Sequence, residues 1–159
     1  MPLSLSMVGR LEHQHETISE LIEGESEARV KEPIYPDKWS AFENIVHLAA
    51  YQPTFIQRLE LILDGNKPKF ARYVADNDPL FHEYLKKSIP ELLRVVAADR
   101  LVITDRLINL NREELQRQAY HPKFGCVSID KWTEFFLLHE AHHLFAIIQL
   151  IGALYVTPQ

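Results

Sequence analysis

Cysteine and glycine are both scarce in this sequence. Cys126 is the only cysteine among 159 residues. A single thiol excludes an internal disulfide, which suits a reducing compartment such as the cytoplasm. The five glycines are too few for a turn-rich sheet protein. These shortages argue against a disulfide-rich secreted domain and against a sandwich or barrel of strands.

Runs of basic residues are missing as well. The chain has 17 Lys and Arg against 22 Asp and Glu, a formal net charge of -5, and no stretch of it forms a basic stripe. This balance argues against nucleic acid as a partner. The amino end has no basic start followed by a long apolar run, and we expect no later stretch to reach the roughly 18 uncharged residues of a membrane span. We therefore expect a cytoplasmic protein that binds neither nucleic acid nor membrane.

What the sequence does contain is an ordinary globular composition arranged at helical spacing. Hydrophobic residues make up 47% and charged residues 25%, close to average usage. The length is that of one domain, so we predict a single domain over residues 1–159. Apolar residues recur every three or four positions almost throughout, which indicates an all-α class.

Four long helices and one short helix are predicted. The long ones cover about 5–27, 40–63, 88–107 and 128–155, and the short one lies near 80–85. Ser40 with Glu43, and Ser88 with Glu91, have the spacing of a capping box at the start of a helix. A mixed segment over 67–87 and a polar connector over 109–127 separate the helices. Four long helices with linkers between them predict a four-helix bundle.

The sequence His-Glu-Ala-His-His, at 139–143, is the strongest signal for chemistry. Positions four apart share one face of a helix, so His139 and His143 can present two imidazoles to one ion, whereas His142 points elsewhere. A catalytic ion of the zinc type usually takes three protein ligands and keeps one position open. His47, in the middle of an apolar helical run, is the best third ligand because a buried polar ring needs a partner.

Other interpretations of these histidines compete with the metal site. A lone inward histidine is often a hydrogen-bonded core residue, and four histidines are expected at the surface: His13, His15, His82 and His121. Glu140 completes the His-Glu-x-x-His pattern of zinc metalloproteases. No His, Asp or Glu follows His143, so the downstream ligand of that class is missing. A di-iron carboxylate site is disfavoured because the strongly apolar helices supply only one Glu-x-x-His unit, Glu140 with His143.

Two parts of the sequence resemble the DinB-like superfamily of metal-binding four-helix bundles. They are Lys38, Trp39 and Ser40 with the run at 45–49, and the segment at 121–125 with Trp132 and the run at 139–143. The resemblance covers about 39–151 and implies His47, His139 and His143 as the ligands. The chain departs from a common form of the signature at Ala50 and Gln52, where acidic residues are usual.

The resemblance implies a metal-dependent hydrolase or a transferase that uses a low-molecular-weight thiol of the bacillithiol or mycothiol type, acting on a small molecule. A homodimer is compatible with it. Three neutral imidazoles suit one divalent ion, zinc or nickel first and iron as a further option, and they favour proton loss from a bound water or thiol.

Glu43 and Glu140 are the candidate catalytic residues. Glu43 either orients the ring of His47 or only caps its helix, and Glu140 is a base only if it faces the ion. A non-catalytic bundle that binds metal or a small ligand is the alternative.

Overall fold

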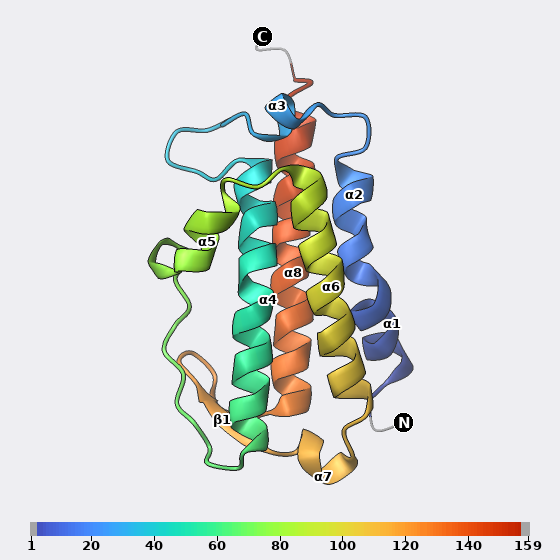
Figure 1. Cartoon of the computed structure of the whole chain (residues 1–159), viewed down its shortest axis with the longest axis vertical. Helices are drawn as coiled ribbons and strands as arrows, with labels where there is room; N and C mark the ends of the chain where they lie inside the picture. Colours follow the sequence, from blue (N-terminus) through green and yellow to red (C-terminus); the bar gives the residue numbers. More distant parts are fainter. Residues whose placement is uncertain (1–2, 157–159) are drawn as a thin grey trace.

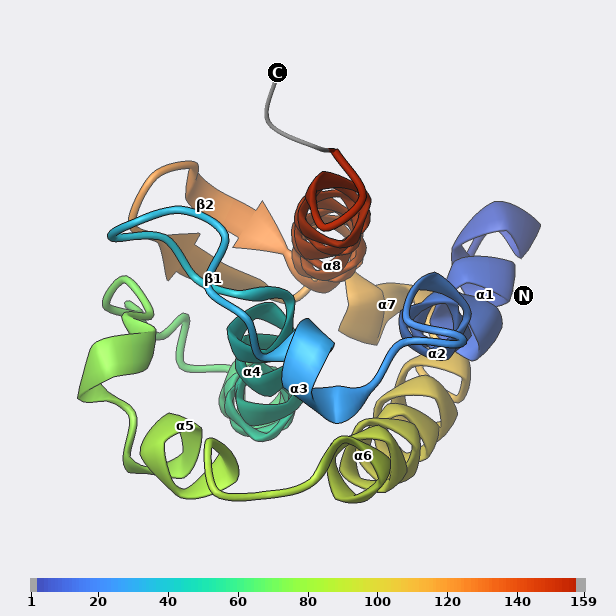
Figure 2. The same ribbon diagram turned by 90° about the horizontal axis from the view of Figure 1, so that it is seen from above.

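The computed structural model describes residues 3–156 as a bundle built around three long helices. These are α4 (Ala41–Leu63), α6 (Ile89–Ile108) and α8 (Ile129–Ala153). The amino-terminal segment forms the fourth column, beside α6 (Figure 1). Seen from above, the four columns stand around a common axis (Figure 2), and two clusters of buried apolar residues fill the space between them. The predicted all-α four-helix bundle is confirmed.

The first column is not the single helix over 5–27 that the sequence predicted. It consists of α1 (Leu5–His13), the 3₁₀ turn η1 (Gln14–Glu16) and α2 (Thr17–Leu21), and after a turn comes the short helix α3 (Glu27–Val30). A 3₁₀ turn keeps the apolar spacing close to that of an α-helix, so the pattern hides the break. Gly24, with φ of 80°, allows the left-handed turn that ends the column.

Two helix starts follow the predicted capping boxes. The Oγ of Ser40 accepts from the backbone N–H of Glu43 at 3.2 Å, and Glu43 Oε2 accepts from the backbone N–H of Ser40 at 2.8 Å. At the start of α6, the backbone N–H and the hydroxyl of Ser88 both donate to Glu91 Oε2, at 2.7 Å and 2.6 Å. The short helix expected near 80–85 is α5 (Pro79–Tyr84), which packs against α4 after the 3₁₀ turn η2 (Ala75–Asn77).

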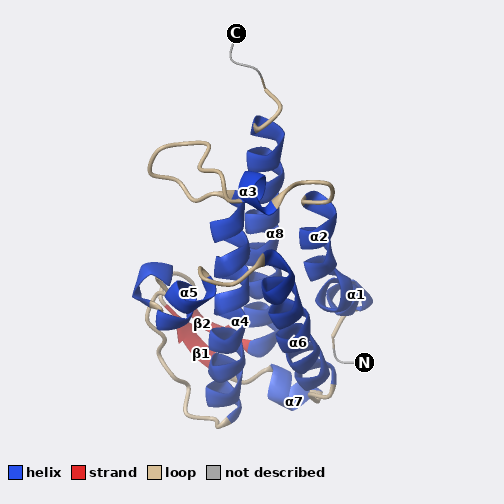
Figure 3. Cartoon of the chain, turned by 45° about the horizontal axis from the view of Figure 1, so that its top comes forward, coloured by secondary structure: helices blue, strands red, loops and turns tan. Residues whose placement is uncertain are grey.

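The connector over 109–127 contains more structure than the sequence predicted. It forms α7 (Arg112–Leu115) and a hairpin of β1 (Gln118–His121) and β2 (Gly125–Ser128), paired antiparallel. Strands of four residues are too short for a clear alternating pattern. The backbone of Tyr120 also bonds to the segment before α5, donating to Pro68 O at 2.9 Å and accepting from Phe70 N at 3.2 Å. Hairpin and segment therefore lie on one side of the bundle, next to α4 (Figures 2 and 3).

Helix α8 is the most apolar helix described. An 18-residue window of it has a mean hydropathy of 1.3, so by length and composition it is able to cross a membrane. The expectation that no stretch is apolar enough was therefore wrong. The same composition is typical of the core helix of a bundle, and α8 packs against α4 and α2.

Candidate metal centre

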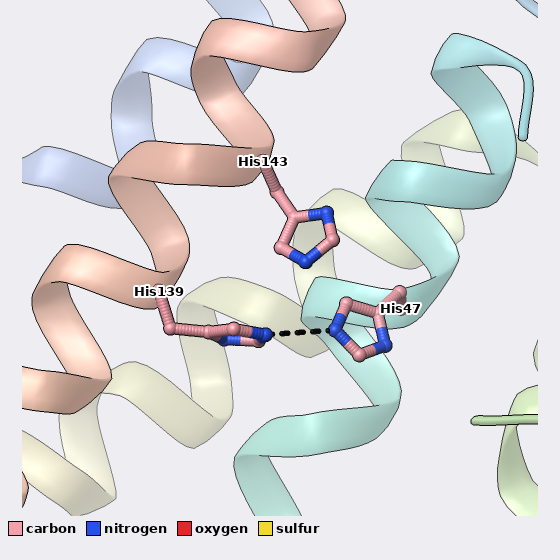
Figure 4. Close-up of side chains that lie close together, drawn as sticks. All are labelled: His47, His139 and His143. Carbon is pink, nitrogen blue, oxygen red and sulfur yellow. Dashed lines mark hydrogen bonds between the residues drawn. The ribbon is translucent and has the colours of Figure 1, made fainter. Parts of the chain in front are cut away.

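Helices α4 and α8 bring together the three histidines that the sequence indicated. His47 lies in the second turn of α4, and His139 and His143 lie one turn apart in the middle of α8. Their rings point at one another (Figure 4). His47 Nε2 and His139 Nε2 are 3.0 Å apart, and one ring nitrogen from each histidine lies within 4.8 Å of the other two.

Burial keeps these imidazoles neutral. His47 is 5% exposed, and desolvation, helped by the neighbouring His139, lowers its pKa to about 3. Desolvation and, secondarily, His142 lower the pKa of His139 to about 4. The pKa of His143 is also lowered far below its usual value, by burial first and by the other histidines second. The neutral imidazole is the form that binds a metal, because one of its ring nitrogens has a free lone pair.

Asn44 determines which nitrogen of His143 is free. Its Oδ1 lies 2.7 Å from His143 Nδ1, while its amide Nδ2 donates to Ser40 O at 2.9 Å. The amide oxygen therefore accepts the proton of Nδ1, and the lone pair of His143 is on Nε2. A partner on the second nitrogen is the usual way in which proteins orient a ligating histidine. Asn44 is 4% exposed, so the bond is shielded from water.

The donor set fits a divalent ion of the zinc type. In the described structure His47 Nδ1 and His139 Nδ1 are buried without a hydrogen-bond partner, and the only side-chain partner outside the trio is Asn44. An ion bound at the facing Nε2 atoms of His47 and His139 would leave these two Nδ1 atoms unpaired, so the fit rests on the convergence of the ring nitrogens. Three imidazole nitrogens converging on one point are a common ligand set for zinc, nickel or iron.

The three rings form one wall of a cavity of about 770 Å³, within the size range of small-molecule sites. Trp39 lies beside His47, with ring centroids 5.1 Å apart, and Tyr51 and Tyr73 pack against each other at 5.0 Å. The outer wall comes from the segment 72–76 and the hairpin turn at 121–123. An ion at the histidines would therefore face a cavity that is partly open to solvent.

Comparison with known proteins shows the family to which this chain belongs. Residues 10–147 match the DinB superfamily. The chain belongs to the DinB superfamily. The resemblance seen in the sequence is thus confirmed, and the match covers most of the bundle and all three histidines.

Two solved structures share the fold of this DinB superfamily protein. YfiT from Bacillus subtilis, described as a probable metal-dependent hydrolase with an unusual four-helix bundle topology, matches with a TM-score of 0.82 and 17% identity over 98% of this chain and 91% of YfiT. TT2238, described as a four-helix bundle protein, matches with a TM-score of 0.65 and 19% identity over 89% of this chain and 95% of TT2238. At these identities the likeness establishes the fold. No curated protein matches the chain.

The two candidate carboxylates of this DinB superfamily protein are both engaged elsewhere. Glu140 is 2% exposed and accepts hydrogen bonds from Arg100 Nη2 and, at 2.9 Å, from Gln14 Nε2. One residue along a helix turns a side chain by about 100°, so Glu140 lies off the face that carries His139 and is directed to Arg100 and Gln14 instead. Glu43 takes part in the capping box, and in the described structure it makes no hydrogen bond to His47.

Sequence reasoning missed several residues around the site. His121, expected at the surface, is half-buried and lines the cavity, with its ring 4.8 Å from that of Phe135. Asn44 had a detectable signal, because it is a polar residue within an apolar helical run, three positions before His47. Arg58 and Tyr73 had none, because loop packing brings them to the cavity.

Proposed function

We propose that His47, His139 and His143 hold one divalent metal ion, and that this DinB superfamily protein is an enzyme that uses the ion to activate water or a low-molecular-weight thiol. The observation that carries the proposal is the convergence of three neutral imidazoles, one buried and two half-buried, on the wall of a cavity. Zinc and nickel suit this donor set best, and iron is compatible with it. The single domain, the cytoplasmic location and the homodimer stay predictions from the sequence.

Each residue has a definite task in this proposal. A divalent ion bound by neutral ligands keeps its full charge and lowers the pKa of a water or thiol beside it. The three imidazoles supply lone pairs, and Asn44 holds the ring of His143 so that Nε2 faces the other two rings. Trp39 and Tyr73 cover the rings and limit access of bulk water. Three protein ligands leave a coordination position for the substrate.

Hydrolysis and thiol transfer are both supported, by different observations. The shared fold with YfiT, described as a probable metal-dependent hydrolase, supports hydrolysis. The position of the carboxylates favours thiol transfer, because Asp76, exposed at the edge, is the one carboxylate among the described residues that line the cavity. A thiol, with an ordinary pKa of about 8.5, loses its proton near neutral pH without a general base more easily than water does.

Metal analysis tests the site. We expect about one ion per chain in the wild-type protein and loss of that ion in His143→Ala, because two imidazoles do not hold it stably. His142→Ala is the matched control, since its exposed ring lies one position away and outside the trio. Equal metal content in wild type and His143→Ala contradicts the assignment.

Two activity screens then separate the chemistries. Metal-loaded protein is assayed with simple esters and amides, and separately with thiols and an electrophilic acceptor, each with and without a chelator. Chelator-sensitive turnover of esters or amides supports the hydrolase, and chelator-sensitive consumption of thiol supports the transferase. Bound metal without turnover in either screen favours the non-catalytic binding bundle.

A further inference from the structure

The lining of the cavity has an excess of positive charge, although the protein as a whole is acidic. Arg58, Arg72 and Lys123 line the cavity, against one carboxylate, Asp76. The chain has 17 basic and 22 acidic residues, so this local excess of positive charge runs against the overall balance. In the part of the chain that the structure describes, none of the three cations forms an ion pair with a carboxylate.

Arg58 is held in place before any ligand binds. Its Nη2 donates to Ala71 O at 2.9 Å, and its guanidinium lies 5.1 Å from the ring centroid of Phe70 and 5.9 Å from that of Trp132. Its charge is close enough to contribute to lowering the pKa of His121, an effect dominated by burial. A half-buried, preorganised guanidinium without a counter-charge is suited to a carboxylate or phosphate oxygen.

His121 adds a neutral donor beside these cations. Its Nδ1 accepts from the backbone N–H groups of Lys123 at 3.0 Å and of Phe124 at 3.2 Å. The ring proton is therefore on Nε2, which is left as a hydrogen-bond donor. Beside the metal centre, the lining of the cavity thus has four donor groups and one carboxylate, which predict a ligand that offers acceptor oxygens and negative charge.

The spacing along α4 gives the approximate length of such a ligand. Arg58 follows His47 by eleven positions, which is close to three full turns, so both residues lie on nearly the same face. At the rise of an α-helix their separation is about 16 Å along the axis. Tyr51 lies between them on this face and also lines the cavity.

We propose that the cavity binds an elongated molecule whose reacting end lies at the three histidines and whose far end is a carboxylate or phosphate received by Arg58, Arg72 and Lys123. The reacting end rests on the metal centre proposed above, whereas the anionic end depends only on the cations. Arg58 supplies the preorganised contact, and the two exposed cations on the loops add attraction.

Binding of matched thiol probes tests this inference. The long probes are sulfanylundecanoate, its primary amide and the corresponding sulfanylundecyl phosphate, and the short pair is sulfanylbutanoate and its amide. Affinities are measured by quenching of tryptophan fluorescence with zinc-loaded and with chelator-treated protein. We expect the long carboxylate or phosphate to bind about tenfold more tightly than the long amide, the range of one charge-assisted hydrogen bond at a partly exposed site. The short pair should show no such preference.

Variants locate the source of the preference. Arg58→Gln should reduce the preference for the long anions to about twofold or less, and the loop variant R72Q/K123Q should lower it in part. Arg94→Gln, on the exposed side of α6 and outside the cavity, should leave it unchanged. Circular dichroism checks that each variant is folded. If Arg58→Gln does not fold, the loop variant R72Q/K123Q still tests the subsite.

The outcomes separate this inference from the metal proposal. Equal affinities of the long anions and the long amide for wild-type protein overturn the anionic subsite, as does a preference that survives in both Arg58→Gln and R72Q/K123Q. If zinc changes no affinity but the preference persists and is lost in Arg58→Gln, the subsite stands and the metal centre fails. Between the two long anions, the tighter binder identifies the oxyanion.

Discussion

Breaking the buried ion pair between Arg100 and Glu140 should cost this bundle a large part of its stability. The two side chains are 1% and 3% exposed. Arg100 also donates to Gln52 Oε1 at 3.1 Å and to Leu11 O at 3.4 Å, and Glu140 accepts from Gln14. The pair therefore links α6 and α8 to α4, α1 and the η1 turn. In Glu140→Gln the guanidinium stays buried without a counter-charge.

The size of the effect follows from this burial. Removing one partner of a buried pair typically costs about 3–5 kcal/mol, out of a total stability of about 5–15 kcal/mol. For a chain of this length that corresponds to a fall in Tm of roughly 10 °C. Arg106 and Glu60 provide the exposed control, with side chains 44% and 48% exposed. Glu60→Gln should cost about 1 kcal/mol or less.

Urea unfolding of metal-free protein, followed by circular dichroism, measures these differences without a contribution from ion binding. The double variant R100M/E140L should recover much of the loss, because replacing both partners of a buried pair with apolar residues is often close to neutral. A cost for Glu140→Gln no larger than that for Glu60→Gln would refute the reasoning. Strictly additive losses in the double variant would refute it equally.

Three further predictions concern the metal centre and pH. Asn44→Ala should weaken metal affinity about 10- to 100-fold, because the ring of His143 loses its orienting partner; chelator competition measures this, and an unchanged affinity would exclude the role of Asn44. Zinc at a hundredfold excess over Kd should stabilise the wild-type protein and His142→Ala by about 2.7 kcal/mol but not His143→Ala, as thermal unfolding will show. Burial first, and Arg100 second, lower the pKa of His15 to about 4 from 6.5. The unfolded chain then binds more protons between these values, so stability should fall as pH drops from about 6.5 to 4; a slope of Tm against pH unchanged in His15→Gln would contradict this.

The parts of the fold that sequence reasoning predicted depend on local chemistry. Capping boxes at Ser40 and Ser88 marked two helix starts because they act within one turn. The spacing of His139 and His143 needed only a helix to bring them to one face. His47 was found because it is a polar ring within an apolar run.

The parts that were missed depend on tertiary contacts or on short elements. The η1 turn keeps the helical spacing and so conceals the break in the first column. Each hairpin strand has four residues, too few for a period to show. The role of Glu140 was decided by Arg100, forty positions away, and the position of Arg58 at the cavity by loop packing. No local pattern encodes these partners.

The histidines lie far apart in the chain, and this separation gives the ion a second role. His139 follows His47 by 92 positions, so in an unfolded chain the site does not exist. Binding one ion would cross-link the start of α4 to the middle of α8 and close a long loop, as a disulfide does elsewhere. This protein has a single thiol and so no internal disulfide. The same ion would then be its covalent-like cross-link between an early and a late helix.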